Sequence, residues 1–254
     1  MNFIEIEKSD SIYQIILNRP DKKNALNLEM ISELSETFKS LEKDEACKLI
    51  VIKAAGDTFS AGADLAWMQK QIDQTFEENL NESNILFDMF LNLSQISKPV
   101  VTYVQKYVMG GALGLLACSD YVFAESNTQF CFSETKLGLA PSVISSFILA
   151  KCNLSSIQKH MMFAEFFSAD KALEMGLVHE VAIQSELILK FENFLKHLSH
   201  LDLSAVQETK RLIQSLNKVN FEESRVETTQ LISKLRVGDE AQSRLKEFLS
   251  KSKA

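Results

Sequence analysis

Two kinds of hydrophobic pattern alternate along the first half of the chain. Short apolar runs, rich in β-branched and aromatic residues, predict strands at 3–7, 12–17, 49–52, 100–104 and 121–124. Between these runs, apolar residues recur at helical spacing and predict helices at 27–43, 64–70, 76–96 and from about 113. Strands that alternate with helices indicate an α/β core whose strands are largely parallel.

The pattern becomes mainly helical after Pro141. It predicts one brief strand at 178–181 and helices at 141–150, 154–164, 169–175, 184–198, 202–216, 220–236 and 239–250. We therefore expect a core over 1–190 and a helical region over 191–254. Apolar faces on so long a helical region need a partner surface, either on the same domain or on a second copy of the chain.

Glycines are concentrated at two places that follow apolar β-branched runs. The chain has eight glycines, and five of them lie in or beside the stretches 56–65 and 109–114. Glycine suits backbone with positive φ or a point where another group must approach closely. Two strand-to-helix turns of this kind could aim free backbone N–H groups at one point, which is the geometry that stabilises an oxyanion. The alternative is that both are ordinary turns.

Composition narrows the protein class. The chain has 254 residues, 46% of them apolar, which fits one large domain. Its net charge of −7 argues against nonspecific nucleic-acid binding, and no apolar run is long enough to predict a membrane span. The first residues do not resemble a signal peptide, so a cytoplasmic protein is expected. The spacing of histidines and cysteines predicts no metal site.

Most common catalytic motifs are absent from the sequence, and one ionisable residue remains as a candidate. There is no Walker loop, GxGxxG or GxSxG motif, and the four histidines are expected to be structural. Glu134 lies in the mostly apolar stretch 129–139, where burial would raise its pKa and suit it to acid–base work. The alternative is a surface glutamate paired with Lys136, which the usual exposure of charged residues favours.

Motifs along the whole chain resemble those of the crotonase family, also called the enoyl-CoA hydratase/isomerase family. Each motif is short, but all of them occur in the order and at the spacing of the family. They are Leu17–Pro20 with Asn24–Leu26, Phe59–Leu65, Gly110–Gly114 with Cys118–Asp120, Phe130–Pro141 and Ala172–Val178. The resemblance implies an α/β spiral of ββα turns, a C-terminal helical trimerisation region and a homotrimer or homohexamer. It also implies acyl-CoA substrates, with coenzyme A as part of the substrate and no separate cofactor.

The resemblance also assigns roles to residues. Ala63 and Gly111 would donate the two oxyanion-hole N–H groups, and Glu134 matches the second of the two glutamates of a hydratase. The first glutamate should stand where this chain has Gly114, which removes the two-carboxylate water clamp. The residues that would cradle the CoA nucleotide are Arg19, Lys22, Asn24, Ala61, Asp64 and Leu65.

A finer resemblance is to the methylglutaconyl-CoA hydratase-like branch, whose bacterial members are associated with leucine catabolism. It rests on 59–68, 131–145 and Leu235–Val237. We therefore expect an enoyl-CoA hydratase acting on a short or branched acyl chain. If that acyl chain carries a second carboxylate, Lys136 or Lys106 would balance it. The alternatives are an isomerase in which Glu134 moves a proton from C2 to C4, and a homologue that binds acyl-CoA without catalysis.

Overall fold

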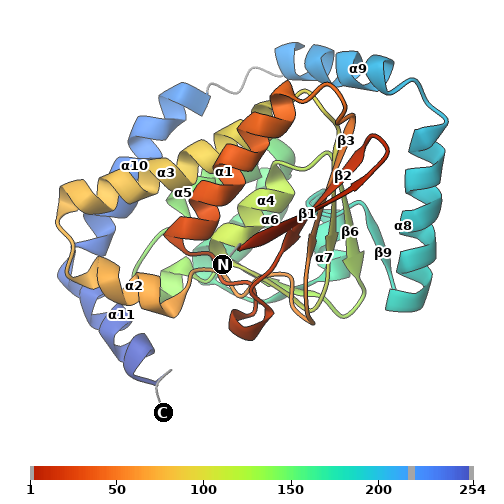
Figure 1. The fold of residues 1–254 in the computed structure, drawn as a ribbon. Coiled ribbons are helices and arrows are strands. Elements are labelled where there is room, and N and C mark those ends of the chain that lie inside the picture. The colour runs from red at the N-terminus through yellow and green to blue at the C-terminus, as the bar shows by residue number, and fades with distance from the viewer. Residues whose placement is uncertain (1–2, 217–220, 252–254) are drawn as a thin grey trace.

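The computed structural model describes residues 3–216 and 221–251, and Figure 1 shows a sheet wrapped by helices. The strands are Ile4–Ser9 (β1), Ile12–Leu17 (β2), Leu49–Ala54 (β3), Val100–Val104 (β4), Tyr107–Met109 (β5), Tyr121–Glu125 (β6), Gln129–Cys131 (β7), Phe167–Ser168 (β8) and Glu180–Ala182 (β9). The α-helices are Leu28–Lys43 (α1), Leu65–Ile72 (α2), Phe76–Gln95 (α3), Leu113–Ala117 (α4), Ser142–Lys151 (α5), Leu154–Phe163 (α6), Ala169–Glu174 (α7), Gln184–Ser199 (α8), Leu203–Leu216 (α9), Phe221–Arg236 (α10) and Asp239–Lys251 (α11). Short 3-10 helices cover Pro20–Lys22 (η1), Gly110–Ala112 (η2) and Glu134–Leu137 (η3).

Six strands form the main sheet in the order β1-β2-β3-β4-β6-β9. β1 and β2 form an antiparallel hairpin, and every other neighbouring pair is parallel. The predicted parallel core is therefore confirmed. The strand predicted at 178–181 begins two residues later, where Glu180 pairs with Phe123 of β6, and His179 N–H bonds to Val122 O just before this ladder.

Both faces of this sheet are covered, which explains why β3 is apolar at consecutive positions. Ile50 and Ile52 join the main core beneath α1, α3, α4 and α5, whereas Leu49 and Val51 face Phe191 of α8 on the opposite side. A parallel sheet buried on both faces has continuous rather than alternating hydrophobicity. Figure 1 shows α8 beside the sheet, away from α1 and α3.

A second, three-stranded sheet was not predicted. Its order is β5-β7-β8, and each of its strands has only two or three residues. β5 lies between the predicted strand β4 and the second glycine turn, so that turn follows β5 rather than β4. β5 and β7 run parallel, with Met109 opposite Cys131, and thereby bring the second glycine turn beside the segment that follows β7.

The C-terminal helices fold back on their own chain. α10 packs along α3 and α5, and α11 packs against α2 and η3, as Figure 1 also shows. Ile232 of α10 joins the main core, and Leu245 and Leu249 of α11 pack on Met68. The expected boundary between residues 190 and 191 falls within α8, and residue 220, the expected start of a helix, lies outside the described residues.

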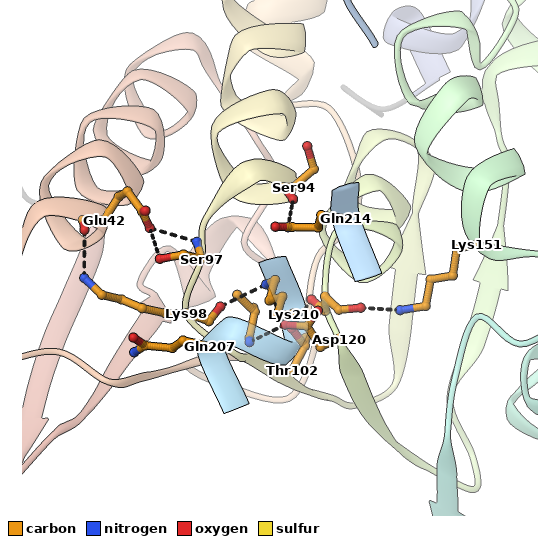
Figure 2. A network of polar contacts seen from close by, with 12 residues as sticks. Glu42, Ser94, Ser97, Lys98, Thr102, Asp120, Lys151, Gln207, Lys210 and Gln214 are labelled. Atoms are coloured by element: carbon orange, nitrogen blue, oxygen red, sulfur yellow. Dashed lines mark hydrogen bonds and ion pairs between the residues drawn. The ribbon is translucent and has the colours of Figure 1, made fainter. Parts of the chain in front are cut away.

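Lys210 joins α9 to the core at a group of buried and half-buried charges that we call the α9 junction (Lys98, Asp120, Lys151 and Lys210; Figure 2). Lys210 Nζ of α9 donates to Lys98 O at 2.9 Å and to Asp120 Oδ2 at 2.6 Å. Lys98 Nζ donates to three carbonyls at the end of α1, those of Leu41, Glu42 and Asp44. Lys151 Nζ donates to the carbonyls of Leu116 and Ser119 at 2.7 and 2.5 Å. Each of these ammonium groups therefore has oxygen partners.

Candidate active site

The two glycine turns lie directly against each other. Ser60 N–H donates to Tyr107 O at 3.0 Å, and Met109 N–H donates to Ser60 O at 3.1 Å. Gly62 has φ +91°, and a Cβ at this position would stand 3.1 Å from Met109 O. Glycine is therefore required by both the backbone conformation and the close approach of the second turn.

The N–H groups of Ala63 and Gly111 are left unused by the residues that the structure describes. Leu26 N–H donates to Gly62 O, and Asp64 N–H donates to Leu26 O, at 2.7 and 2.8 Å. Because N–H groups alternate in direction along an extended chain, the Ala63 N–H points away from Leu26. Gly111 lies in the first turn of a helix, where N–H groups have no intrahelical acceptor. Within the described residues neither N–H has a hydrogen-bond acceptor.

Glu134 begins η3, three residues after β7, and its carboxyl group lies beside the second glycine turn. A Cβ built on Gly110 would be 3.4 Å from Glu134 Oε1. Oε2 is buried and has no hydrogen-bond partner among the described residues. Burial raises the pKa of Glu134 to about 7, against smaller lowering effects from its own backbone N–H and the charge of Arg236. The carboxyl group can therefore exchange a proton near neutral pH.

Lys136 does not neutralise Glu134, as the alternative interpretation required. Its Nζ lies 4.7 Å from the centre of the Phe166 ring and donates to Cys131 Sγ at 3.6 Å. The ion pairs of the described residues do not include one between Glu134 and Lys136. Glu134 is thus held as an isolated carboxyl group rather than as half of a surface pair.

A cavity of about 1160 Å³ joins these groups. Ala63, Gly111 and Glu134 all line it, together with residues of α2, α5, α10 and α11. Its walls therefore combine two free N–H donors and one poised carboxyl group with apolar surface, which is typical of a site for a largely apolar ligand with one polar reacting group.

The sequence matches the model of the enoyl-CoA hydratase/isomerase family over residues 7–254. The chain belongs to this family. A crotonyl-CoA hydratase from Syntrophomonas wolfei is 30% identical over 187 residues, covering 73% of this chain and 71% of that relative. The crystal structure of an enoyl-CoA hydratase from Shewanella pealeana has a TM-score of 0.81 and 35% identity, and covers 98% of this chain and 94% of that chain.

The family assignment confirms the α/β fold that the motifs predicted. Some relatives are longer than this chain. The enoyl-CoA hydratase AKT6-1 from Alternaria alternata is 29% identical over 198 residues, which are 78% of this chain but only 64% of that relative. The chain therefore spans less than two thirds of the length of this fungal member of the enoyl-CoA hydratase/isomerase family.

The resemblance places the first glutamate of a hydratase at the position of Gly114, and this position is tightly packed. A Cβ at Gly114 would lie 2.6 and 2.7 Å from two ring atoms of Phe90, and 2.8 Å from Ile144 Cγ2. These separations are shorter than any ordinary carbon–carbon contact. The space where a second carboxylate would begin is therefore filled by the core.

The residues predicted to cradle the CoA nucleotide fall into two groups. Lys22, Ala61, Asp64 and Leu65 line the cavity. Arg19 and Asn24 are instead used within the loop that carries them. Arg19 donates to Ala25 O and to Asp64 Oδ2, at 2.6 and 2.8 Å. Asn24 is fully buried and donates to Ala55 O and Thr58 O, both at 2.8 Å. Their side chains fix the shape of the loop.

Ser142 and Arg236 are polar residues at the cavity to which the sequence analysis gave no role. Ser142, at the start of α5, is buried and its Oγ has no hydrogen-bond partner among the described residues. Arg236 ends α10 and is also buried. Nothing local marks either residue, because each reaches the cavity only through the packing of its helix. The finer motif Leu235–Val237 contains Arg236 but carried no statement about its role.

Neither a metal site nor a membrane-spanning helix is found among the described residues. Among residues 3–216 and 221–251, no cluster of three or more His, Cys, Asp or Glu side chains could hold a metal ion. None of the described helices has the length and apolar character needed to cross a membrane. The predicted histidine roles agree with the contacts of His179, whose Nδ1 accepts from Val122 N–H and whose ring stacks on Tyr121.

Proposed function

We propose that the chain is an enoyl-CoA hydratase that adds water to the double bond of a short or branched 2-enoyl-CoA. The observation that carries the proposal is Glu134: a carboxyl group with a pKa of about 7 faces the same cavity as two unused backbone N–H groups. Membership of the enoyl-CoA hydratase/isomerase family supports a thioester as the polar reacting group.

The N–H groups of Ala63 and Gly111 would hold the thioester oxygen. Attack on C3 moves the π electrons of the double bond toward C1, and negative charge develops on this oxygen. Fixed donors that meet developing charge stabilise the transition state more than the ground state. Losing one such donor typically slows the reaction by about 10²–10³.

Glu134 would supply both proton transfers. The ionised carboxylate takes a proton from water as the water oxygen bonds to C3, and an enolate forms. The enolate then collapses, and the proton held by Glu134 moves to C2. Glu134 returns to its ionised form, so one carboxylate suffices. The buried Ser142 Oγ, which lines the same cavity without a partner, is suited to orient the water.

The CoA moiety would lie along the loop after β2, where Lys22 and Lys23 are exposed at the cavity. Both are free to meet phosphate as point charges. Ala61, Asp64 and Leu65 form the adjoining wall, and Arg19 and Asn24 support the loop from behind. Coenzyme A takes part only as the carrier of the substrate, and the proposed reaction uses no separate cofactor.

A second candidate is a 3-enoyl-CoA isomerase, and the packing around Gly114 favours it. Phe90 and Ile144 fill the space for a second carboxylate, so a water held between two glutamates is not available. An isomerase needs only one base: Glu134 removes a proton from C2, the oxyanion hole holds the dienolate, and the same proton is delivered to C4. The site offers the groups that this reaction requires.

A substrate panel separates these functions. Purified protein is given crotonyl-CoA, 3-methylglutaconyl-CoA and a 3-enoyl-CoA, and products are identified by mass spectrometry and NMR. We expect hydration of at least one 2-enoyl substrate, and turnover of 3-methylglutaconyl-CoA would support the finer branch. Double-bond migration in the 3-enoyl substrate without hydration of the others would replace the hydratase by the isomerase. Tight binding without turnover of any substrate would indicate a non-catalytic homologue.

We further propose that the chain forms a homotrimer or a homohexamer. Large apolar side chains are exposed on α6 and the segment that follows it: Leu154, Met162, Phe163 and Phe166. Clustered exposed apolar residues mark protein contact surfaces. Light scattering coupled to size-exclusion chromatography should give three or six times the 28.7 kDa mass of the chain, and a monomer would refute the assembly.

A further inference from the structure

The cavity contains a buried cation that the proposed reaction does not use. Arg236 ends α10, and the residue is 8% exposed. Its Nη1 donates to Ser83 Oγ at 3.1 Å, and its guanidinium carbon lies 6.0 Å from the centre of the Trp67 ring. These contacts hold the guanidinium in one place at the wall of the cavity that also contains Glu134.

Most of the hydrogen-bonding capacity of Arg236 is unused. A guanidinium has five N–H donors, and the bond to Ser83 is its only side-chain hydrogen bond within the described residues. A buried cation without a paired anion is unfavourable, because burial removes its hydration. Burial accordingly lowers the pKa of Arg236 to about 10, although the negative charges of Glu82 and Glu134 oppose this effect. The guanidinium is thus suited to receive an anion.

The described residues do not supply that anion at contact distance. Glu82 is already held by three donors, Trp67 Nε1 at 2.7 Å, Gln71 Nε2 at 3.0 Å and Gln74 Nε2 at 2.7 Å. The ion pairs among the described residues do not include Arg236. An anionic group that arrives with the ligand would supply the partner that this buried arginine lacks among the described residues.

An acyl-CoA offers two kinds of anion, and burial distinguishes them. The CoA phosphates belong near the exposed Lys22 and Lys23, at the surface of the cavity. Arg236 instead shares a buried wall with Trp67 and Ile232 and senses the charge of Glu134. It therefore lies with the reacting end of the ligand. The planar guanidinium fork fits a carboxylate through two parallel hydrogen bonds.

We propose that Arg236 is a specificity residue that selects acyl groups ending in their own carboxylate. The inference rests on the proposed function, because the oxyanion donors are what would place the acyl chain in this cavity. It replaces the expected contacts of Lys106 and Lys136: Lys106 is paired with Asp57 outside the cavity, and Lys136 lines the cavity but is exposed and lies over Phe166.

The test compares two 2-enoyl thioesters of similar length that differ in charge. trans-Glutaconyl-CoA ends in a carboxylate, and trans-2-hexenoyl-CoA ends in an ethyl group. The wild-type kcat/KM should be at least tenfold higher for glutaconyl-CoA. Arg236→Met should lower kcat/KM for glutaconyl-CoA about 10²-fold, because a charge-assisted bidentate contact is lost. The value for hexenoyl-CoA should change less than about threefold.

Two further variants keep the result interpretable. Arg225 lies on the same helix but pairs with Asp88 at 3.2 Å and does not line the cavity, so Arg225→Met should affect both substrates equally. Arg236→Lys keeps the charge but loses the fork, and should recover only part of the preference. If Arg236→Met does not fold, Arg236→Lys alone decides. A variant that prefers glutaconyl-CoA over hexenoyl-CoA as strongly as the wild type does would overturn the bidentate contact.

A binding measurement separates failure of this inference from failure of the hydratase proposal. Calorimetry with the saturated ligands glutaryl-CoA and hexanoyl-CoA needs no turnover. Preferential binding of glutaryl-CoA that disappears in Arg236→Met supports the carboxylate contact even if no substrate is hydrated. Equal binding of both ligands by the wild type overturns it, even if crotonyl-CoA is hydrated. The pH profile of kcat/KM gives a further check. If Arg236→Met shifts this profile equally for both enoyl substrates, Arg236 acts on Glu134, and the proposed contact with the acyl carboxylate is overturned.

Discussion

The protein buries charge in two regions and treats it in opposite ways. At the α9 junction, Lys98 is 4% exposed and its ammonium group donates three hydrogen bonds, one for each of its protons. In the cavity, Glu134 Oε2 and Ser142 Oγ have no partner among the described residues, and Arg236 uses one side-chain hydrogen bond. Full pairing stabilises the fold, whereas incomplete pairing leaves groups ready for a ligand.

The difference follows from what surrounds each group. The junction gathers main-chain carbonyls from the ends of α1 and α4, where a helix stops and its last carbonyls lack the usual intrahelical donor. The cavity is lined by side chains and by N–H groups from two turns that meet edge to edge. We therefore expect substitutions at the junction to change stability, and substitutions in the cavity to change activity.

The largest expected effect is on catalysis, at Glu134. Glu134→Gln removes the only carboxyl group that the proposed reaction uses and should lower kcat about 10³- to 10⁴-fold. Binding of hexanoyl-CoA should remain within about threefold, because the oxyanion donors are main-chain groups. In the wild type, kcat/KM should fall about tenfold per pH unit below pH 7, since the base must be ionised and its pKa is about 7.

The matched control for this change is Glu165→Gln. Glu165 is paired with Lys159 at 2.7 Å and does not line the cavity, so steady-state kinetics should be unchanged. Turnover by Glu134→Gln at more than a tenth of the wild-type rate would exclude Glu134 as the base. It would also remove the main functional contrast between the cavity and the junction.

The next largest effect is on stability, at Lys98. Lys98→Met leaves three carbonyls of the α1 end without their shared donor in a buried site. Removing one side of a buried polar network costs about 3–5 kcal/mol. Arg236→Met should change the free energy of unfolding by less than about 1 kcal/mol, because most donors of Arg236 are unpaired. Urea denaturation of both variants measures the contrast, and equal losses would contradict it.

Features of the fold and of the candidate site that depend on local sequence could be predicted. Those that depend on contacts between segments distant in the sequence could not. Periodicity predicted the strands of the main sheet, and a lone glutamate in an apolar stretch drew attention to Glu134. The small sheet was missed because β5, β7 and β8 are too short to show a period. Arg236 and Lys210 could not be assigned, because their surroundings exist only after α10 and α9 have docked on distant segments.

A third prediction concerns stability at the proposed catalytic residue, Glu134. In the unfolded chain Glu134 has its ordinary pKa near 4.5, and in the folded chain about 7. Below pH 4.5 both states are protonated. As the pH rises from 4.5 to 7 the unfolded state releases its proton first, so the wild type loses stability. Relative to the wild type, Glu134→Gln should gain under about 1 kcal/mol at pH 5 and about 3 kcal/mol at pH 8.5.

Urea midpoints at these two pH values test this sign. If the stability gained by Glu134→Gln grows with pH, the ionised carboxylate of Glu134 destabilises the wild-type fold. The fold then carries this cost in the cavity for the sake of the reaction. A gain independent of pH would mean that Glu134 is ordinarily solvated, and that the cavity resembles the rest of the surface rather than contrasting with the α9 junction.

The smallest expected effect concerns the missing second carboxylate at Gly114. Gly114→Ala places a methyl group 2.6–2.8 Å from Phe90 and Ile144, and overpacking of this kind costs about 1–3 kcal/mol, more than the helix propensity that alanine adds. A decrease of roughly 2–4 °C in Tm per kcal/mol is expected for a domain of this size. Gly111→Ala is the matched control, because its nearest contact is 4.0 Å away, and its Tm should stay within about 2 °C of wild type.

If Gly114→Ala is as stable as the wild type, Phe90 can move aside and the cavity could accept a second carboxylate. If it is not, the core itself limits this site to one acid–base group, and Gly114→Glu should lose stability without raising the rate of hydration above that of the wild type.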